Sequence, residues 1–348
     1  MIVFNNFCPL LFSMAHSKER QLWQAATDGD LETVKILASD PGVNVNWSDE
    51  DVQRTPFYRA CFYGRLEVVK FLMGLPQVDV TQIQSEGYSP FCISCQEGHG
   101  DVALRLLRDP RIDPNLQNPL NGATPIFMAC QIGHPHVIAI LLNDSRVNPN
   151  LPDSDNCTPL WQSAQNGSLA VVQLLLASER VIDPQVISTW NKKAAALHAR
   201  AMGSRTLKRD DETQAEFLKS KTYGPIIADL VEEYERDPAA SRRRLRLLPG
   251  VREYFIARIF ALVVFYSDSY LALKGPPLAK RLLKALLGPE MAASDRTRFF
   301  LIAARLPLEL QMVLCNRLLG SGENSVLSKY SEPGFRWVAN KWTWGNQK

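Results

Sequence analysis

The chain has 348 residues, of which 46% are hydrophobic and 22% are charged, values typical of a soluble globular protein. This composition excludes a wholly disordered chain, a collagen-like chain and a protein with several membrane spans. The net charge of +3 conceals an asymmetry: residues 1–184 carry 12 basic and 20 acidic side chains, whereas residues 185–348 carry 27 and 16. The two parts therefore have net charges of −8 and +11, which indicates two units with different roles.

We expect residues 1–17 to form an N-terminal extension, within which Met14 is a second candidate for the start of translation. This segment is apolar but lacks the basic residues that open a signal peptide. No stretch reaches the roughly 18 apolar residues of a membrane span, since Arg258 and Asp268 interrupt residues 254–273. The seven cysteines are odd in number and widely spread, unlike a disulfide framework. We therefore expect a cytoplasmic protein, with the nucleus as an alternative.

An internal repeat organises residues 18–203. Five glycines lie 35, 34, 35 and 34 residues apart, and a Thr-Pro or Ser-Pro pair stands nine residues before the last four of them. Thr or Ser caps a helix, Pro favours its first turn, and Gly ends it, so each unit is predicted to be a helix, a tight turn and a second helix. Stretches rich in Asp, Asn and Pro between the units suit hairpin turns. The glycines are Gly29, Gly64, Gly98, Gly133 and Gly167.

These units, such as TPFYRACFYGRLEVVKFL and TPIFMACQIGHPHVIAILL, resemble the ankyrin repeat. The resemblance implies an all-α ankyrin-repeat solenoid over residues 18–204, with five repeats and a degenerate sixth that ends at Gly203. It also implies that His99 and His134, directly after repeat glycines, tie adjacent repeats together. The His of the family's Thr-Pro-Leu-His motif is replaced here, which implies altered packing of the first helix. The replacing residues are Tyr58, Cys92, Phe127 and Trp161.

Residues 205–348 lose the repeat and become basic, and we expect them to form an all-α helical C-terminal domain. Its segments LPGVREYF, ALVVFYSD, LPLELQMVL and SEPGF are similar to the tail of ankyrin proteins of unicellular eukaryotes. No function follows from this similarity. Pro and Gly punctuate the predicted helices, which cover residues 225–236, 238–248, 251–273, 277–287, 295–304, 307–319 and 326–340.

Residues 306–342 resemble an F-box in outline, since LPLELQMVLCNRLLG is followed by FRWVANKWTW. An ordinary amphipathic helix with Pro in its first turn explains Leu306–Leu318 equally well. The basic run Arg242–Arg246, with Lys192-Lys193 and Lys208-Arg209, would attract nucleic acid, anionic lipid or an import receptor. We favour a solvated helix face whose Leu245, Leu247 and Leu248 face the core, because no aromatic residues accompany the run for base stacking.

Cys92 and Cys95 form a CxxC motif, which in another context would suggest a metal or redox site. Both occupy first-helix positions of the repeat, where Cys61 and Cys130 recur singly, so we interpret them as small core residues. The chain contains no Ser-His-Asp ordering, no Gly-rich phosphate loop and no dense carboxylate pair. We therefore expect no catalytic residues, no cofactor and no metal, and a protein that is not an enzyme.

The resemblance implies a protein-protein interaction module that binds an unidentified protein on its concave face. The alternatives are a substrate adaptor of a ubiquitin ligase, through residues 306–342, and nucleic-acid binding by the basic half, which we consider unlikely. The acidic repeats predict a basic or mixed partner surface, unless the two halves attract each other. The family's binding positions correspond to hairpin residues Asp51, Val52, Arg54, Glu86, Tyr88, Leu120, Asn121, Ser154 and Asp155 and helix-end residues Phe62, Tyr63, Gln96, Glu97, Gln131, Ile132, Gln165 and Asn166.

Overall fold

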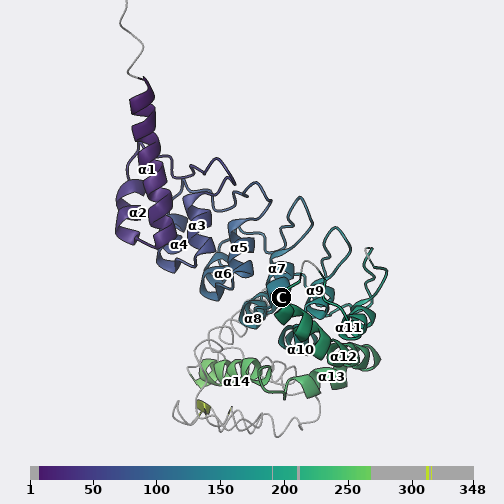
Figure 1. Cartoon of the computed structure of the whole chain (residues 1–348). Coiled ribbons are helices and arrows are strands. Elements are labelled where there is room, and N and C mark those ends of the chain that lie inside the picture. The colour runs from purple at the N-terminus through teal and green to yellow at the C-terminus, as the bar shows by residue number, and fades with distance from the viewer. Residues whose placement is uncertain (1–7, 190, 210–211, 268–310, 313–314, 316–348) are drawn as a thin grey trace, which may run out of the picture. The chain divides into compact units, whose positions relative to one another are not determined.

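The computed structural model describes residues 8–189, 191–209, 212–267, 311–312 and 315, and every regular element in these ranges is a helix (Figure 1). The all-α prediction is thus confirmed for the described part of the chain. The chain divides into two compact units. The first unit comprises Met1–Val137 with Leu151–Asp155, and the second comprises Ile138–Asn150 with Asn156–Lys348.

The first unit is a stack of helix pairs in chain order. Its first helices pack α1 on α3, α3 on α5 and α5 on α7, and its second helices pack α2 on α4 and α4 on α6 (Figure 1). The helix that follows α7, Pro135–Asn143 (α8), begins in the first unit and ends in the second. The stacked helices are Cys8–Asp28 (α1), Leu31–Ala38 (α2), Pro56–Phe62 (α3), Leu66–Met73 (α4), Pro90–Gln96 (α5), Gly100–Leu106 (α6) and Pro125–Ile132 (α7).

The first helices begin and end as the sequence predicts. Each of the four Thr-Pro or Ser-Pro pairs supplies a cap whose hydroxyl accepts a hydrogen bond from the backbone N–H three residues later, at 3.1–3.3 Å. Proline occupies the first turn after each cap, where no hydrogen bond is lost. All five repeat glycines have positive φ, between 62° and 94°, a conformation that side chains with a Cβ rarely adopt. The caps are Thr55, Ser89, Thr124 and Thr158.

The hairpin turns share one backbone feature. Each has a left-handed residue two positions before the first helix is capped, at Gln53, Gly87, Gly122, Asn156 and Lys192. The N–H of Asp49 donates to the carbonyl of Arg54 at 3.3 Å, and the N–H of Ser188 donates to that of Lys193 at the same distance. The Ser188–Lys193 turn therefore has the geometry of the earlier hairpins, which extends the repeat to a sixth unit.

The second unit completes this sixth helix pair. The helix Ala195–Gly203 (α11) packs on Pro159–Gln165 (α9), and Gln214–Arg236 (α12) packs on both Leu169–Ala177 (α10) and α11. First helices thus lie on first helices and second helices on second helices, as in the first unit. The domain boundary after residue 204 stays a prediction. The helix α12, which begins after this boundary, is the second helix of the sixth pair.

The predicted start of α12 is wrong by eleven residues. Proline normally marks a first turn, and the sequence therefore predicted a helix from Pro225. The helix instead begins at Gln214, where the Thr213 hydroxyl accepts from the N–H of Glu216 and the Glu216 carboxylate accepts from the N–H of Thr213. This capping box fixes the start of the helix. Pro225 lies inside the helix.

Two glycines allow α11 and α12 to approach each other closely. A Cβ on Gly224 would lie 2.4 Å from the carbonyl oxygen of Ala199, and one on Gly203 would lie 2.5 Å from the Cδ of Pro225. Both distances are far below van der Waals contact. The absence of side chains at these two positions is therefore a condition of the sixth helix pair.

The basic run lies on Pro238–Leu245 (α13) and just beyond it, and its side chains bind other parts of the second unit. Arg246 is buried and donates from Nε to the carbonyl of Ala177, the last residue of α10, at 3.0 Å. Arg242 donates to the carbonyl of Arg180 at 3.1 Å and to the Tyr234 hydroxyl at 2.6 Å. These cations satisfy carbonyls at a helix C-terminus, where positive charge is favoured.

The prediction that the run forms a solvated helix face is therefore wrong for Arg246. Leu245 is buried as expected, but Leu247 is 54% exposed and does not face the core. Arg246 is buried because its guanidinium group reaches the carbonyl of Ala177 and the ring of Phe255. The helix α13 ends at Leu245, three residues before the predicted end.

Arg252–Ser267 (α14) carries a second buried guanidinium group. Arg258 donates to the side-chain oxygen of Asn143, and the Arg258 and Arg246 guanidinium groups lie 4.9 and 4.7 Å from the ring centroid of Phe255. Burial lowers the pKa of Arg258 to about 10, while the carboxylate of Glu179 opposes this shift. The aromatic ring and the carboxylate thus compensate two buried positive charges.

The remaining predicted helices lie wholly or partly outside the described residues. Residues 277–287, 295–304 and 326–340 are outside them, and α14 matches the predicted helix 251–273 up to Ser267. Within 307–319, the described residues Gln311, Met312 and Cys315 are helical.

His198 is the buried imidazole of the second unit. Its ring stacks on Trp161 with centroids 4.2 Å apart, and its Nδ1 accepts a hydrogen bond from Asn191 at 2.7 Å. Burial lowers its pKa to about 4, and the nearby cations Lys193, Arg209 and Arg205 add to the shift. The folded second unit therefore holds His198 in its neutral form.

We predict that Gly224→Ala destabilises the second unit by about 2 kcal/mol, because the new methyl group would overlap the carbonyl of Ala199. Urea unfolding followed by circular dichroism measures the loss. Thr222→Ala, at an exposed position of α12, is the matched control and should leave stability unchanged or slightly raised. Equal stability of the two variants would show that the helices separate at little cost.

We predict that acid weakens the second unit through His198. The folded pKa of about 4 lies below the unfolded value of about 6.5, so between these values only the unfolded chain binds the proton. The contribution of neutral His198 to the free energy of unfolding is therefore fully present above pH 6.5 and is lost as the pH decreases towards 4. Between pH 7 and pH 5 the free energy of unfolding should fall by about 2 kcal/mol. Urea unfolding at both pH values measures this change. His198→Gln should lose this dependence, and an unchanged dependence would assign it to other groups.

Candidate functional site

A ladder of hydrogen bonds joins successive helix pairs of the first unit. In each case the side chain directly after a repeat glycine donates to the carbonyl two residues before the preceding glycine. Arg65 donates to Thr27 at 2.8 Å, His99 donates to Phe62 at 2.8 Å, and His134 donates to Gln96 at 2.8 Å. The predicted tying role of the two histidines is confirmed, and Arg65 is a third member that the sequence interpretation missed.

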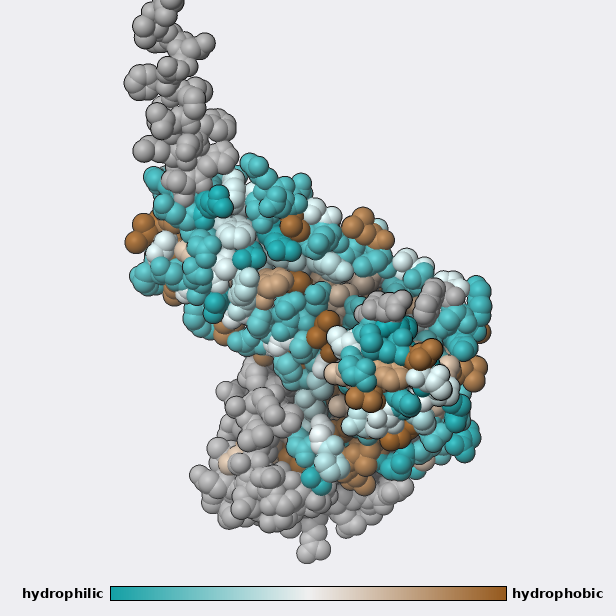
Figure 2. Space-filling view, in the orientation of Figure 1, coloured by the Kyte–Doolittle hydropathy of each residue, from teal (hydrophilic) through white to brown (hydrophobic). Residues whose placement is uncertain are grey.

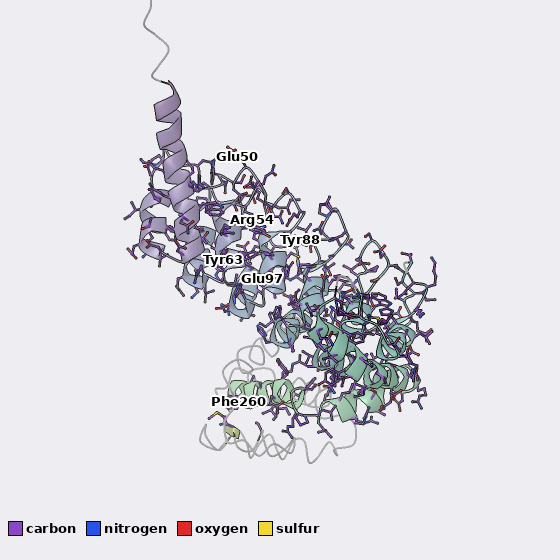
Figure 3. The ribbon with its side chains drawn as sticks, viewed as in Figure 1. Glu50, Arg54, Tyr63, Tyr88, Glu97 and Phe260 are labelled. Carbon is purple, nitrogen blue, oxygen red and sulfur yellow. The ribbon has the colours of Figure 1, made fainter. Side chains whose placement is uncertain are left out.

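These bonds use backbone carbonyls at the ends of the first helices, so the side chains of the acceptor residues take no part in them. Tyr63 is 39% exposed and Ile132 is 52% exposed, whereas Phe62, Gln96 and Gln131 are half-buried. The helix ends and the hairpins follow one another along the repeat stack, as the labelled residues of Figure 3 illustrate. We call this set the first-unit surface; it comprises residues 50–54, 62–63, 86–88, 96–97, 120–121, 131–132 and 154–155.

Nearly all of the predicted binding positions belong to the first-unit surface. Among the hairpin positions, Leu120 is 70% exposed, Asp51 and Glu86 are exposed, and Tyr88 is half-buried. Gln165 and Asn166 are half-buried and belong to the second unit. The remaining members of the predicted set on the first-unit surface are Val52, Arg54, Glu97, Asn121, Ser154 and Asp155, all exposed or half-buried.

An arginine organises the aromatic part of this surface. The guanidinium group of Arg59 lies 4.2 Å from the Trp23 ring centroid, 4.6 Å from that of Tyr63 and 6.0 Å from that of Phe62. Its Nε donates to the Thr27 hydroxyl at 3.1 Å. Phe62 and Tyr63 also contact each other, with centroids 4.9 Å apart. Cation–π contacts of this kind hold the rings in fixed positions.

Tyr88, another aromatic residue among the predicted binding positions, does not belong to this aromatic group. Its hydroxyl instead accepts a hydrogen bond from the Nδ2 of Asn121 in the next hairpin at 3.4 Å. Trp23 and Arg59 were missed. A signal for Trp23 exists in the sequence, since it stands at the repeat position of Trp161, and both indoles donate to hairpin carbonyls at 2.8 and 3.0 Å.

The charged part of this surface is mainly acidic. Five of its side chains are carboxylates, Glu50, Asp51, Glu86, Glu97 and Asp155. Its basic groups are Arg54 and, against its aromatic rings, Arg59. The view in Figure 2 shows that hydrophilic residues cover most of the first unit and that hydrophobic residues occur there in small separate groups. Chemically, such a surface offers aromatic faces and carboxylates rather than a catalytic constellation.

The CxxC motif lies in the core, as expected. Cys92 and Cys95 are both buried on α5, and burial raises the pKa of the Cys92 thiol to about 12 and that of Cys95 well above its usual range. A thiol with a raised pKa is neither a good nucleophile nor a good metal ligand. Among the described residues, no group of three or more His, Cys, Asp or Glu side chains is placed to hold a metal ion.

A family model described as ankyrin repeats (3 copies) matches residues 22–118 and residues 95–187. Residues 22–187 are therefore ankyrin repeats. The comparison with curated proteins found no match. The matched range ends before α11, so the helix pair α11 and α12 extends the stacking of the matched ankyrin repeats by one further unit.

Two further predictions concern other parts of the chain. None of the described helices is both long and apolar enough to cross a membrane. The F-box-like segment 306–342 lies outside the described residues except for Gln311, Met312 and Cys315.

We predict that the thiols of the repeats are almost unreactive in the folded protein. In a Cys8→Ser background, a colorimetric thiol reagent at pH 8 should react on the order of a hundredfold more slowly without urea than with it, because burial withholds the thiolate. Rapid reaction confined to Cys92 and Cys95 would contradict the core assignment and restore the redox interpretation. The thiols concerned are Cys61, Cys92, Cys95, Cys130 and Cys157, all buried.

Proposed function

We propose that this protein is a non-enzymatic interaction module that binds a protein partner on the first-unit surface. The observation that carries the proposal is the aromatic group around Arg59. Its three rings are held by a cation, and one of them, Tyr63, is 39% exposed. Aromatic and arginine side chains dominate the binding energy of protein interfaces.

The mechanism is docking on a surface that is already arranged. The bond from His99 to the carbonyl of Phe62 and that from His134 to the carbonyl of Gln96 fix the helix ends from which the surface side chains project. Arg59 restricts the rotamers of the adjacent rings. Less conformational entropy is then lost when a partner binds, which leaves more of the contact energy for affinity.

The contacts of the basic run weigh against nucleic-acid binding by the second unit. Arg242 and Arg246 donate to carbonyls of their own unit, and Arg244 forms an ion pair with Glu233. These side chains would have to leave their partners in order to neutralise phosphates. The ubiquitin-ligase adaptor role stays a prediction that rests on residues 306–342, and the cytoplasmic or nuclear location also stays a prediction.

We predict that replacing Phe62 and Tyr63 by Ala in the full chain abolishes capture of the principal partner in affinity purification. Losing both rings removes the exposed aromatic group, which should reduce affinity by at least about tenfold. Quantitative mass spectrometry of the purified complexes measures the change.

Tyr223→Ala is the matched control, because Tyr223 is 37% exposed and lies on α12 in the second unit. This variant should retain the partner. Circular dichroism checks that both variants fold. A partner that is retained by the double variant and lost by the control would move binding away from the first-unit surface.

A further inference from the structure

We propose that the partner presents a basic segment, with Lys or Arg side chains beside apolar ones, to the first-unit surface. This inference rests on the proposed function and names the chemistry of the partner. It is based on the charged groups of this surface. Carboxylates outnumber cations there, and the guanidinium groups lie against aromatic rings.

Four of the five carboxylates of this surface are in no ion pair within the described part of the chain. No ion pair among the described residues includes Glu50, Asp51, Glu86 or Glu97. Glu86 receives a hydrogen bond from the neutral amide of Gln84 at 3.1 Å, and Glu97 receives one from that of Gln96 at 3.3 Å. Amide donors orient these carboxylates without neutralising them.

Several acids elsewhere in the first unit are in ion pairs. Glu32 pairs with Lys35 at 2.7 Å on α2, and Glu67 pairs with Lys70 at 2.6 Å on α4. Asp109 pairs with Arg111 at 2.7 Å. These pairs neutralise part of the charge on the second helices and the loops after them, whereas the four carboxylates of the first-unit surface give it a negative potential that would attract a cation.

The cations of this region are engaged with rings. Arg59 lies among Trp23, Phe62 and Tyr63, and the Arg54 guanidinium group lies 5.9 Å from the Phe62 ring centroid. Among the described residues, neither guanidinium group forms an ion pair with a carboxylate of the hairpins. A phosphate-bearing ligand would meet repulsion here, which favours a basic protein segment over a nucleic acid.

Apolar groups flank the acids along the repeats. Tyr63 precedes Glu97 by one repeat, and Ile132 follows it at the same repeat position, 52% exposed. Leu120, at the tip of the next hairpin after Glu86, is 70% exposed. A segment that crosses several repeats would therefore meet an aromatic group, then carboxylates, then aliphatic side chains. This order predicts basic residues with apolar neighbours.

The test selects peptides from a random 12-residue phage library on the full chain. We expect the enriched peptides to contain Lys or Arg next to apolar residues. A synthetic copy of the best peptide is then measured by fluorescence anisotropy at 50 and 300 mM NaCl. Glu86→Gln combined with Glu97→Gln should weaken its binding about tenfold, and the higher salt concentration should weaken binding to the unaltered chain.

The matched control is Glu32→Gln combined with Glu67→Gln, which removes the same charge from α2 and α4 and should leave binding unchanged. Enriched peptides that are neutral or acidic, or equal binding by the Glu86 and Glu97 variant, would overturn the inference. If Tyr63→Ala abolishes peptide binding and the glutamine variant does not, the basic-segment inference fails and the proposed function stands. If no peptide is enriched, or neither change affects binding, the result counts against both.

Discussion

In the first unit, each junction between repeats contains the same hydrogen bond, from the side chain after a repeat glycine to a carbonyl of the preceding repeat, and the stacking depends on it. The repeat glycine makes this hydrogen bond possible in two ways. Its positive φ turns the chain into the second helix, and its missing Cβ leaves room for the next repeat's side chain. A Cβ on Gly64 would lie 2.5 Å from the Nδ1 of His99, and a Cβ on Gly98 would lie 2.8 Å from the ring of His134. The regular glycine spacing is thus a requirement of the junctions and not only of the turns.

Features determined by neighbouring residues could be predicted from the sequence. Caps such as Thr55, the repeat glycines and the buried CxxC motif all follow from chemistry within a few positions, and each is found as expected. The histidine junctions were also predictable, but only through the family resemblance. The bond from Arg65 could not be predicted through the resemblance, because the family has a histidine at this position. Arg65 nevertheless makes the same bond as His99 and His134.

Features that depend on distant residues could not be predicted in this way. The close approach of α11 and α12 depends on Gly203 and Gly224 together, two residues 21 positions apart in the chain. Arg246 is buried because it reaches the end of α10, 69 positions earlier in the chain. The aromatic group depends on Arg59 reaching back to Trp23 in the previous repeat. In each case the local sequence was compatible with more than one structure, and a contact between distant residues determined which of them forms.

The junction bonds have a consequence for how this surface can change during evolution. Their acceptors are main-chain carbonyls, and the residues that supply them, Thr27, Phe62 and Gln96, occupy the same repeat position. A carbonyl is present whatever the side chain is, so mutation at this position leaves the junction acceptor in place. Under the proposed function, the side chains of Phe62 and Gln96 carry partner specificity while their backbone carbonyls keep the junctions intact. Point mutations at these two positions would then exchange one partner for another without rebuilding the fold.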